Sequence, residues 1–87
     1  MFELHNKTAM VTGGAQGIGK AISLALAKQG AQVAIADLNE EIAKETADLI
    51  QKTNGKAMAV ETDITDMEKV KKAVSAIKEK FGAIDIL

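Results

Sequence analysis

A glycine-rich segment near the N-terminus constrains the fold of this chain more than any other feature. Thr12–Gly19 follows the pattern T-G-x-x-x-G-x-G and joins an apolar run of strand type, Thr8–Val11, to a helical pattern of apolar residues that begins at Ile18. Glycines at such a junction allow a tight turn, close approach of a pyrophosphate to the backbone, and close packing of helix on strand. The unpaired N–H groups of the first helical turn then bind the anion.

Glycine also occurs in many turns between strands and helices for structural reasons alone, so a second signal is needed. A dinucleotide site places an acidic residue about 20 positions further on, at the end of the second strand, where it binds ribose hydroxyls. Asp37 ends the β-rich run Gln32–Asp37 at the required distance after Gly17. The alternative role for Asp37 is the N-cap of the next helix, but Asn39 is better placed for it. The sequence therefore predicts a nucleotide site.

Strand and helix patterns alternate along the chain without a linker, a repeat or a low-complexity segment. We expect strands at 8–12, 32–37 and 56–61, a fourth strand at 84–87, and helices at 17–29 and 40–53. Gly30 and Asn54-Gly55 are expected to end the first two helices, and Asn39 to cap the second. This βαβαβαβ order predicts an α/β fold of Rossmann type, with a parallel sheet in the order 3-2-1 and the fourth strand beside the first.

A third helix is expected to begin with a capping box formed by Thr65 and Glu68 and to end at Gly82. Its apolar residues are spaced alternately three and four apart, which is typical of a helix with one buried face. The residues expected on this face are Met67, Val70, Val74, Ile77 and Phe81.

The glycine pattern resembles the N-terminal half of the short-chain dehydrogenase/reductase (SDR) family, and the resemblance spans the chain. A second match is Asp63-Ile64-Thr65, which is similar to the D-[I/V/L]-[T/S] step after that family's third strand. The resemblance implies that Asp63 accepts a hydrogen bond from the adenine amino group and that the Ile64 backbone contacts the ring. Without the glycine motif, Asp63 would be interpreted as a solvated loop carboxylate. The cofactor-binding residues expected are Gly13, Gln16, Gly17, Ile18, Gly19, Asp37, Leu38, Asp63 and Ile64.

The charge near the ribose predicts NAD rather than NADP. A carboxylate repels the adenosine 2′-phosphate of NADP, whereas it accepts hydrogen bonds from the two ribose hydroxyls of NAD. The positions where NADP-using relatives place a basic residue correspond to Gln16 and Leu38, and neither is basic here. Lys20 lies in the first helical turn and is interpreted as a solvated surface residue.

The resemblance also implies that residues 1–87 form the N-terminal part of a single NAD(P)-binding domain without an internal boundary. Family members have roughly 250 residues, and their N-N-A-G segment and catalytic Ser and Tyr-x-x-x-Lys lie beyond the matched part. The chain has no tyrosine. Ser23 and Ser75 fall in the middle of expected helices, so we expect no catalytic residue in this chain. The complete protein is expected to transfer hydride between NAD(H) and an alcohol or ketone.

Two further hypotheses stay open. In the first, the chain is a free-standing, truncated nucleotide-binding or interaction module without catalysis. Another parallel α/β family, such as a methyltransferase, also places an acid after its second strand, but the glycine spacing and Asp63-Ile64-Thr65 argue against it.

Composition limits the possible partners. A net charge of −1 and a pI of about 5.8 offer no electrostatic footprint for nucleic acid or an anionic membrane. The chain has no cysteine, and its single histidine, His5, cannot form a zinc site. No window approaches about 18 apolar residues, and the first residues lack the apolar core of a signal peptide, so we expect a cytoplasmic protein. Uncovered sheet surface predicts a homo-oligomer.

Overall fold

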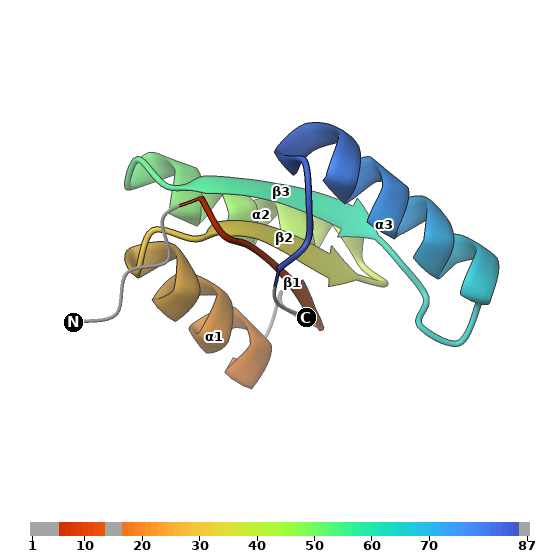
Figure 1. The fold of residues 1–87 in the computed structure, drawn as a ribbon. Helices are drawn as coiled ribbons and strands as arrows, with labels where there is room; N and C mark the ends of the chain where they lie inside the picture. The colour runs from red at the N-terminus through yellow and green to blue at the C-terminus, as the bar shows by residue number, and fades with distance from the viewer. Residues whose placement is uncertain (1–5, 14–16, 86–87) are drawn as a thin grey trace.

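The computed structural model describes residues 6–13 and 17–85, in which strands and helices alternate as expected (Figure 1). The elements are β1 (Thr8–Thr12), α1 (Gly17–Lys28), β2 (Gln32–Asp37), α2 (Glu40–Lys52), β3 (Lys56–Glu61) and α3 (Met67–Phe81). The bounds of the three strands agree with the sequence prediction, and α1 and α2 each end one residue earlier than predicted.

The three strands form a parallel sheet in the order β1-β2-β3, with β2 in the centre. The register pairs Met10 of β1 with Ala34 of β2, and Ala34 with Met58 of β3. Because parallel strands point the same way, their carboxyl ends meet at one edge of the sheet (Figure 1). This edge is where the sequence predicts the nucleotide site.

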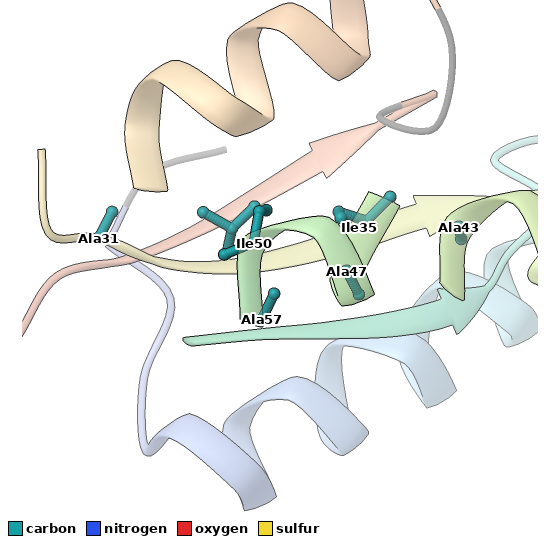
Figure 2. Packing of buried hydrophobic residues seen from close by; sticks show 7 residues of the cluster. Ala31, Ile35, Ala43, Ala47, Ile50 and Ala57 are labelled. Atoms are coloured by element: carbon teal, nitrogen blue, oxygen red, sulfur yellow. The ribbon is translucent and has the colours of Figure 1, made fainter. Parts of the chain in front are cut away.

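Helices cover both faces of the sheet, which makes the fold an α/β fold of Rossmann type. One hydrophobic cluster joins β2 and β3 to α1 and α2, and Figure 2 shows Ile50 and Ala47 of α2 packed over Ile35 and Ala57 of the sheet. A second cluster on the other face joins Met10, the β2 alanines and β3 to α3. Burial on both faces explains why β2 is apolar without alternation.

The ends of α1 and α2 follow the sequence prediction. Gly30 N–H donates to Ala27 O and Ala31 N–H to Leu26 O, the bond pair of a Schellman motif with Gly30 at C′. Asn39 caps α2, because its side chain accepts a hydrogen bond from Ile42 N–H at 3.2 Å.

The predicted capping box of α3 is wrong. Asp66, not Thr65, is the N-cap, and its Oδ1 accepts hydrogen bonds from the backbone N–H groups of Glu68 and Lys69. Thr65 lies one residue too early, in a turn closed by a bond from Asp66 N–H to Asp63 O, and its hydroxyl donates to Asp63 instead. The Thr65 hydroxyl is therefore bonded within the turn and does not cap the helix.

The predicted buried face of α3 is wrong at its first residue. Met67 is 67% exposed, whereas Ile77 and Ala73 are buried. Figure 1 shows that the N-terminal turn of α3 lies beyond the end of β3, so no sheet surface lies beneath Met67. The other predicted residues, Val70, Val74 and Phe81, are half-buried.

The predicted fourth strand is not formed by its described residues, Ile84 and Asp85. The chain nevertheless returns to β1 as expected. Asp85 N–H donates to Thr8 O at 2.8 Å, and Thr8 N–H donates to the Asp85 carboxylate at 2.9 Å. A single residue that pairs with β1 through one backbone bond and one side-chain bond does not make a strand ladder. Ile86 and Leu87 lie outside the described residues.

Candidate functional site

Backbone hydrogen bonds hold the loops after β1 and β3 against the end of β2. Gly13 N–H, after β1, donates to Ala36 O at 2.8 Å. Thr62 N–H, after β3, donates to Asp37 O at 3.0 Å. The three strand ends therefore present their following loops together at the carboxyl edge of the sheet.

These loops surround a depression of about 320 Å³. It gathers five of the residues predicted to bind a cofactor, from three separate parts of the chain: Gly13, Asp37, Leu38, Asp63 and Ile64. Gly17, Ile18 and Gly19 lie in the first turn of α1 and do not line it. Gln16 lies outside the described residues. The full lining is Thr12, Gly13, Ala36, Asp37, Leu38, Thr62, Asp63, Ile64 and Thr65.

Two of the predicted glycines have backbone angles that side chains disfavour. Gly13 has φ of +65° and Gly17 has φ of +54°, in the left-handed region. A Cβ built on either residue meets no described atom within 4 Å, so the requirement for glycine comes from the backbone angle. Ile18, next to Gly17, is 80% exposed, so the start of α1 is open to solvent or to a ligand.

Asp37 lines the depression, and a hydrogen bond orients its carboxylate. Its Oδ1 accepts a hydrogen bond from Asn39 N–H at 3.0 Å, and Asn39 in turn caps α2. The alternative role of Asp37 as the N-cap is therefore filled by Asn39. A carboxylate offers about four acceptor positions, and this bond uses one of them. Asp37 keeps the capacity to accept bonds from a pair of hydroxyls.

Two exposed aliphatic side chains project from the loops that line the depression. Leu38 follows β2 and is 68% exposed, and Ile64 follows β3 and is 69% exposed. Exposure of large aliphatic side chains to water is unfavourable. A flat apolar group that covers these two side chains therefore gains binding free energy.

Asp63 is oriented by its neighbour in the following turn. Its Oδ1 accepts hydrogen bonds from the Thr65 hydroxyl at 2.6 Å and from Thr65 N–H at 2.9 Å. These bonds, the one from the hydroxyl first, hold the pKa of Asp63 below its ordinary value of 3.8. The group is therefore a carboxylate, and an acceptor only, at neutral pH.

Replacement of Thr65 by valine should raise the pKa of Asp63 toward 3.8, because the largest cause of the lowering is removed. In the parent protein, the lowered pKa of Asp63 stabilises the folded state at pH values above its ordinary pKa of 3.8. This stabilisation is lost as the pH falls through the lowered pKa. An NMR titration of the Asp63 side chain measures both values. Thr65→Ser, which keeps the hydroxyl, is the control and should leave the pKa low. An equal pKa in Thr65→Val and the parent would contradict the assigned cause.

Sequence reasoning missed four residues of the lining: Thr12, Ala36, Thr62 and Thr65. Thr62 is the most informative of them. It is 3% exposed, and among the described residues its Oγ1 has no hydrogen-bond partner. The signal available in the sequence was its position directly between the end of β3 and Asp63.

Other candidate groups lie away from this edge. Lys20 lines a groove with α2 residues, including Glu45 and Asp48. Ser23 is buried in α1, where its hydroxyl donates to Gly19 O at 2.8 Å. Within 6–13 and 17–85, no three His, Cys, Asp or Glu side chains come close enough to hold a metal ion. The helices in these ranges are too short or too polar to span a membrane.

Comparison with known proteins places the whole described chain in one family. The model of the short chain dehydrogenase family matches residues 7–87. Short-chain dehydrogenase/reductase homolog YusS of Bacillus subtilis (strain 168) is 45% identical over 94% of this chain and 76% of its own length. L-2,3-butanediol dehydrogenase of Corynebacterium glutamicum is 48% identical over 94% of this chain and 33% of its own length.

Solved structures agree with these matches. A hydroxysteroid dehydrogenase from Escherichia coli superposes with a TM-score of 0.92 at 35% identity, over 95% of this chain and 35% of that one. Apart from YusS, the chain thus spans about a third of the length of these relatives. The glycine pattern, the parallel sheet and the family match converge, and the chain belongs to the short-chain dehydrogenase family.

Proposed function

We propose that this chain is the NAD-binding portion of an oxidoreductase that transfers hydride between NAD(H) and an alcohol or ketone. The observation that carries this proposal is the depression at the carboxyl edge, which brings Asp37 and Leu38 together with Asp63 and Ile64. In parallel α/β sheets this edge is where nucleotides bind. We also propose that residues 1–87 form part of one NAD(P)-binding domain.

The residues present fit the adenosine half of a dinucleotide. Leu38 and Ile64 offer apolar contact to the adenine, and the Asp63 carboxylate accepts from its amino group. Asp37 accepts from the ribose hydroxyls, and the first turn of α1, at Gly17, Ile18 and Gly19, donates N–H groups to the pyrophosphate. Bound NAD supplies the hydride acceptor. The part played by this chain is to bind and orient the adenosine end.

Asp37 is proposed to select NAD over NADP. Asp37→Ala should weaken NAD binding by about 1.5 to 3 kcal/mol, or roughly 10- to 150-fold, because a charged acceptor is lost. Discrimination against NADP should fall in the same variant, since the repulsion of the 2′-phosphate disappears. Fluorescence titration of the protein as encoded, with any residues that follow Leu87, measures both affinities. Asp48→Ala, an exposed carboxylate on α2, is the matched control.

Tighter binding of NADP than of NAD by the parent protein would overturn this assignment. Equal loss of NAD affinity in Asp37→Ala and Asp48→Ala would mean that net charge, not the position of Asp37, governs binding.

The proposed substrate class follows from the relatives. The names of two of them specify a butanediol and a hydroxysteroid, and both are alcohols. An assay of the protein as encoded with alcohols, diols and their ketones tests this class. A location in the cytoplasm is part of the proposal and rests on composition alone.

A second hypothesis takes the chain as a small nucleotide-binding module without catalysis. It draws support from YusS, because this chain covers 76% of that relative. Reading the coding sequence beyond Leu87 discriminates the two hypotheses. Continuation into N-N-A-G and Tyr-x-x-x-Lys supports the oxidoreductase, and a stop codon supports the module.

The 87-residue chain should self-associate. Exposed aliphatic residues on α1, Ile18, Ile22 and Leu24, leave apolar surface in water, and among the described strands β1 pairs with β2 alone. Sedimentation velocity should show dimers or larger species whose proportion rises with concentration. A compact monomer at every concentration would contradict this expectation.

A further inference from the structure

We propose that the hydroxyl of Thr62 is a further binding group of the depression, without a partner among the described residues and hydrogen-bonded to the adenosine of a bound cofactor. This inference rests on the proposed function. It concerns a residue outside the glycine pattern and outside Asp63-Ile64-Thr65.

The position of Thr62 is fixed by its backbone. Its N–H donates to Asp37 O at 3.0 Å, and it directly precedes Asp63, so its backbone joins the two residues proposed to bind ribose and adenine. Thr62 lines the depression and is 3% exposed. Thr62 therefore belongs to the wall of the site and not to the solvated surface.

The hydroxyl of Thr62 differs from other threonine hydroxyls in the described ranges. The Thr65 hydroxyl donates to Asp63, the Thr53 hydroxyl donates to Ile50 O at 2.9 Å, and the Thr8 hydroxyl accepts from Gln32 at 3.4 Å. Among the buried side-chain nitrogen and oxygen atoms of residues 6–13 and 17–85, Thr62 Oγ1 is the one that has no hydrogen-bond partner. A buried hydroxyl without a partner destabilises the fold, so such an exception calls for an explanation.

Polar side chains also line the depression, but the Thr65 hydroxyl and one oxygen each of Asp37 and Asp63 are already hydrogen-bonded within the loops. Much of its wall is apolar, from Gly13, Ala36, Leu38 and Ile64. In the proposal, a rotation of about 120° about the Cα–Cβ bond of Thr62 carries its hydroxyl from the buried position to another staggered position that faces the depression. A bound purine or ribose carries both donors and acceptors, so the hydroxyl gains there the partner that the described residues do not supply.

Replacement of Thr62 by valine tests the proposal, because valine keeps the shape and removes the hydroxyl. Two opposite effects are expected in the protein as encoded. The melting temperature without ligand should rise by a few degrees, since an unpaired buried hydroxyl is removed. The affinity for ADP-ribose, measured by calorimetry, should fall roughly three- to tenfold, which is the range of one neutral hydrogen bond.

Two matched variants complete the experiment. Thr62→Ser keeps the hydroxyl and should bind ADP-ribose as the parent does. Thr46→Val removes a threonine hydroxyl that is equally buried in α2, and it should leave the affinity unchanged.

Each other outcome overturns the proposal in a distinct way. A lower melting temperature in Thr62→Val means that the hydroxyl has a partner within the fold. A higher melting temperature with unchanged affinity means that the hydroxyl does not reach the ligand. If Asp37→Ala weakens ADP-ribose binding and Thr62→Val does not, the proposed function stands and this inference fails. If the parent does not bind ADP-ribose, both fail.

Discussion

The 87-residue chain, assayed alone, should neither oxidise nor reduce an alcohol or ketone at a measurable rate. Hydride transfer to a carbonyl leaves a developing alkoxide that needs a proton donor, and a positioned acid or base contributes about 10²- to 10⁴-fold. The chain has no tyrosine, and the hydroxyl of Ser23 is buried in α1 and bonded to Gly19. Absorbance at the NADH band, with alcohols, diols, ketones and sugars as substrates, measures the turnover.

The protein as encoded is the positive control in the same assay if its sequence continues beyond Leu87. Turnover by the 87-residue chain within about a hundredfold of that control would mean that a catalytic group lies in this part of the chain. NAD binding by the chain without turnover agrees with the prediction, because binding and chemistry rest on different residues.

Replacement of Ile35 by alanine should destabilise the fold by about 2 to 5 kcal/mol. Ile35 lies in the central strand, is 0% exposed, and packs with α2 residues such as Ile50 (Figure 2). The change removes buried methyl groups and leaves a cavity that a sheet held on both sides cannot close. A small domain has only about 5 to 15 kcal/mol of stability. Urea denaturation followed by circular dichroism measures the loss.

Leu49→Ala is the control for this substitution, because Leu49 lies on α2 and is 42% exposed. Its free energy of unfolding should fall by a much smaller amount. Equal losses in the two variants would show that the cluster around β2 does not carry more of the stability than the surface of α2 does.

The order of elements was predictable because each one is encoded locally. The apolar runs of the strands, the cap at Asn39 and the C′ glycine Gly30 act over a few residues and are readable in sequence. The errors arose where contacts outside the helix itself decide the outcome, with the sheet in one case and with the preceding turn in the other. Met67 satisfies the helical periodicity but has no sheet beneath it, and Thr65 satisfies a capping pattern but is bonded to Asp63.

The candidate site was predictable in part for the same reason. Asp37 ends β2, and Asp63 and Ile64 come shortly after the end of β3, so their place at one edge follows from the parallel order. The sequence cannot show which neutral residues complete the wall. The burial of Thr62, and the lack of a described partner for its hydroxyl, depend on how the loop after β3 folds over the end of β2.

The two backbone bonds that β2 accepts at its end, from Gly13 N–H and Thr62 N–H, make this strand the common reference for the site. A loop substitution changes one binding group at a time. A shift of β2 by a single residue would instead turn Asp37 to the opposite face and would move both acceptors that position the neighbouring loops. A loop substitution therefore has a local effect, whereas a change in the length or register of β2 would displace the whole site.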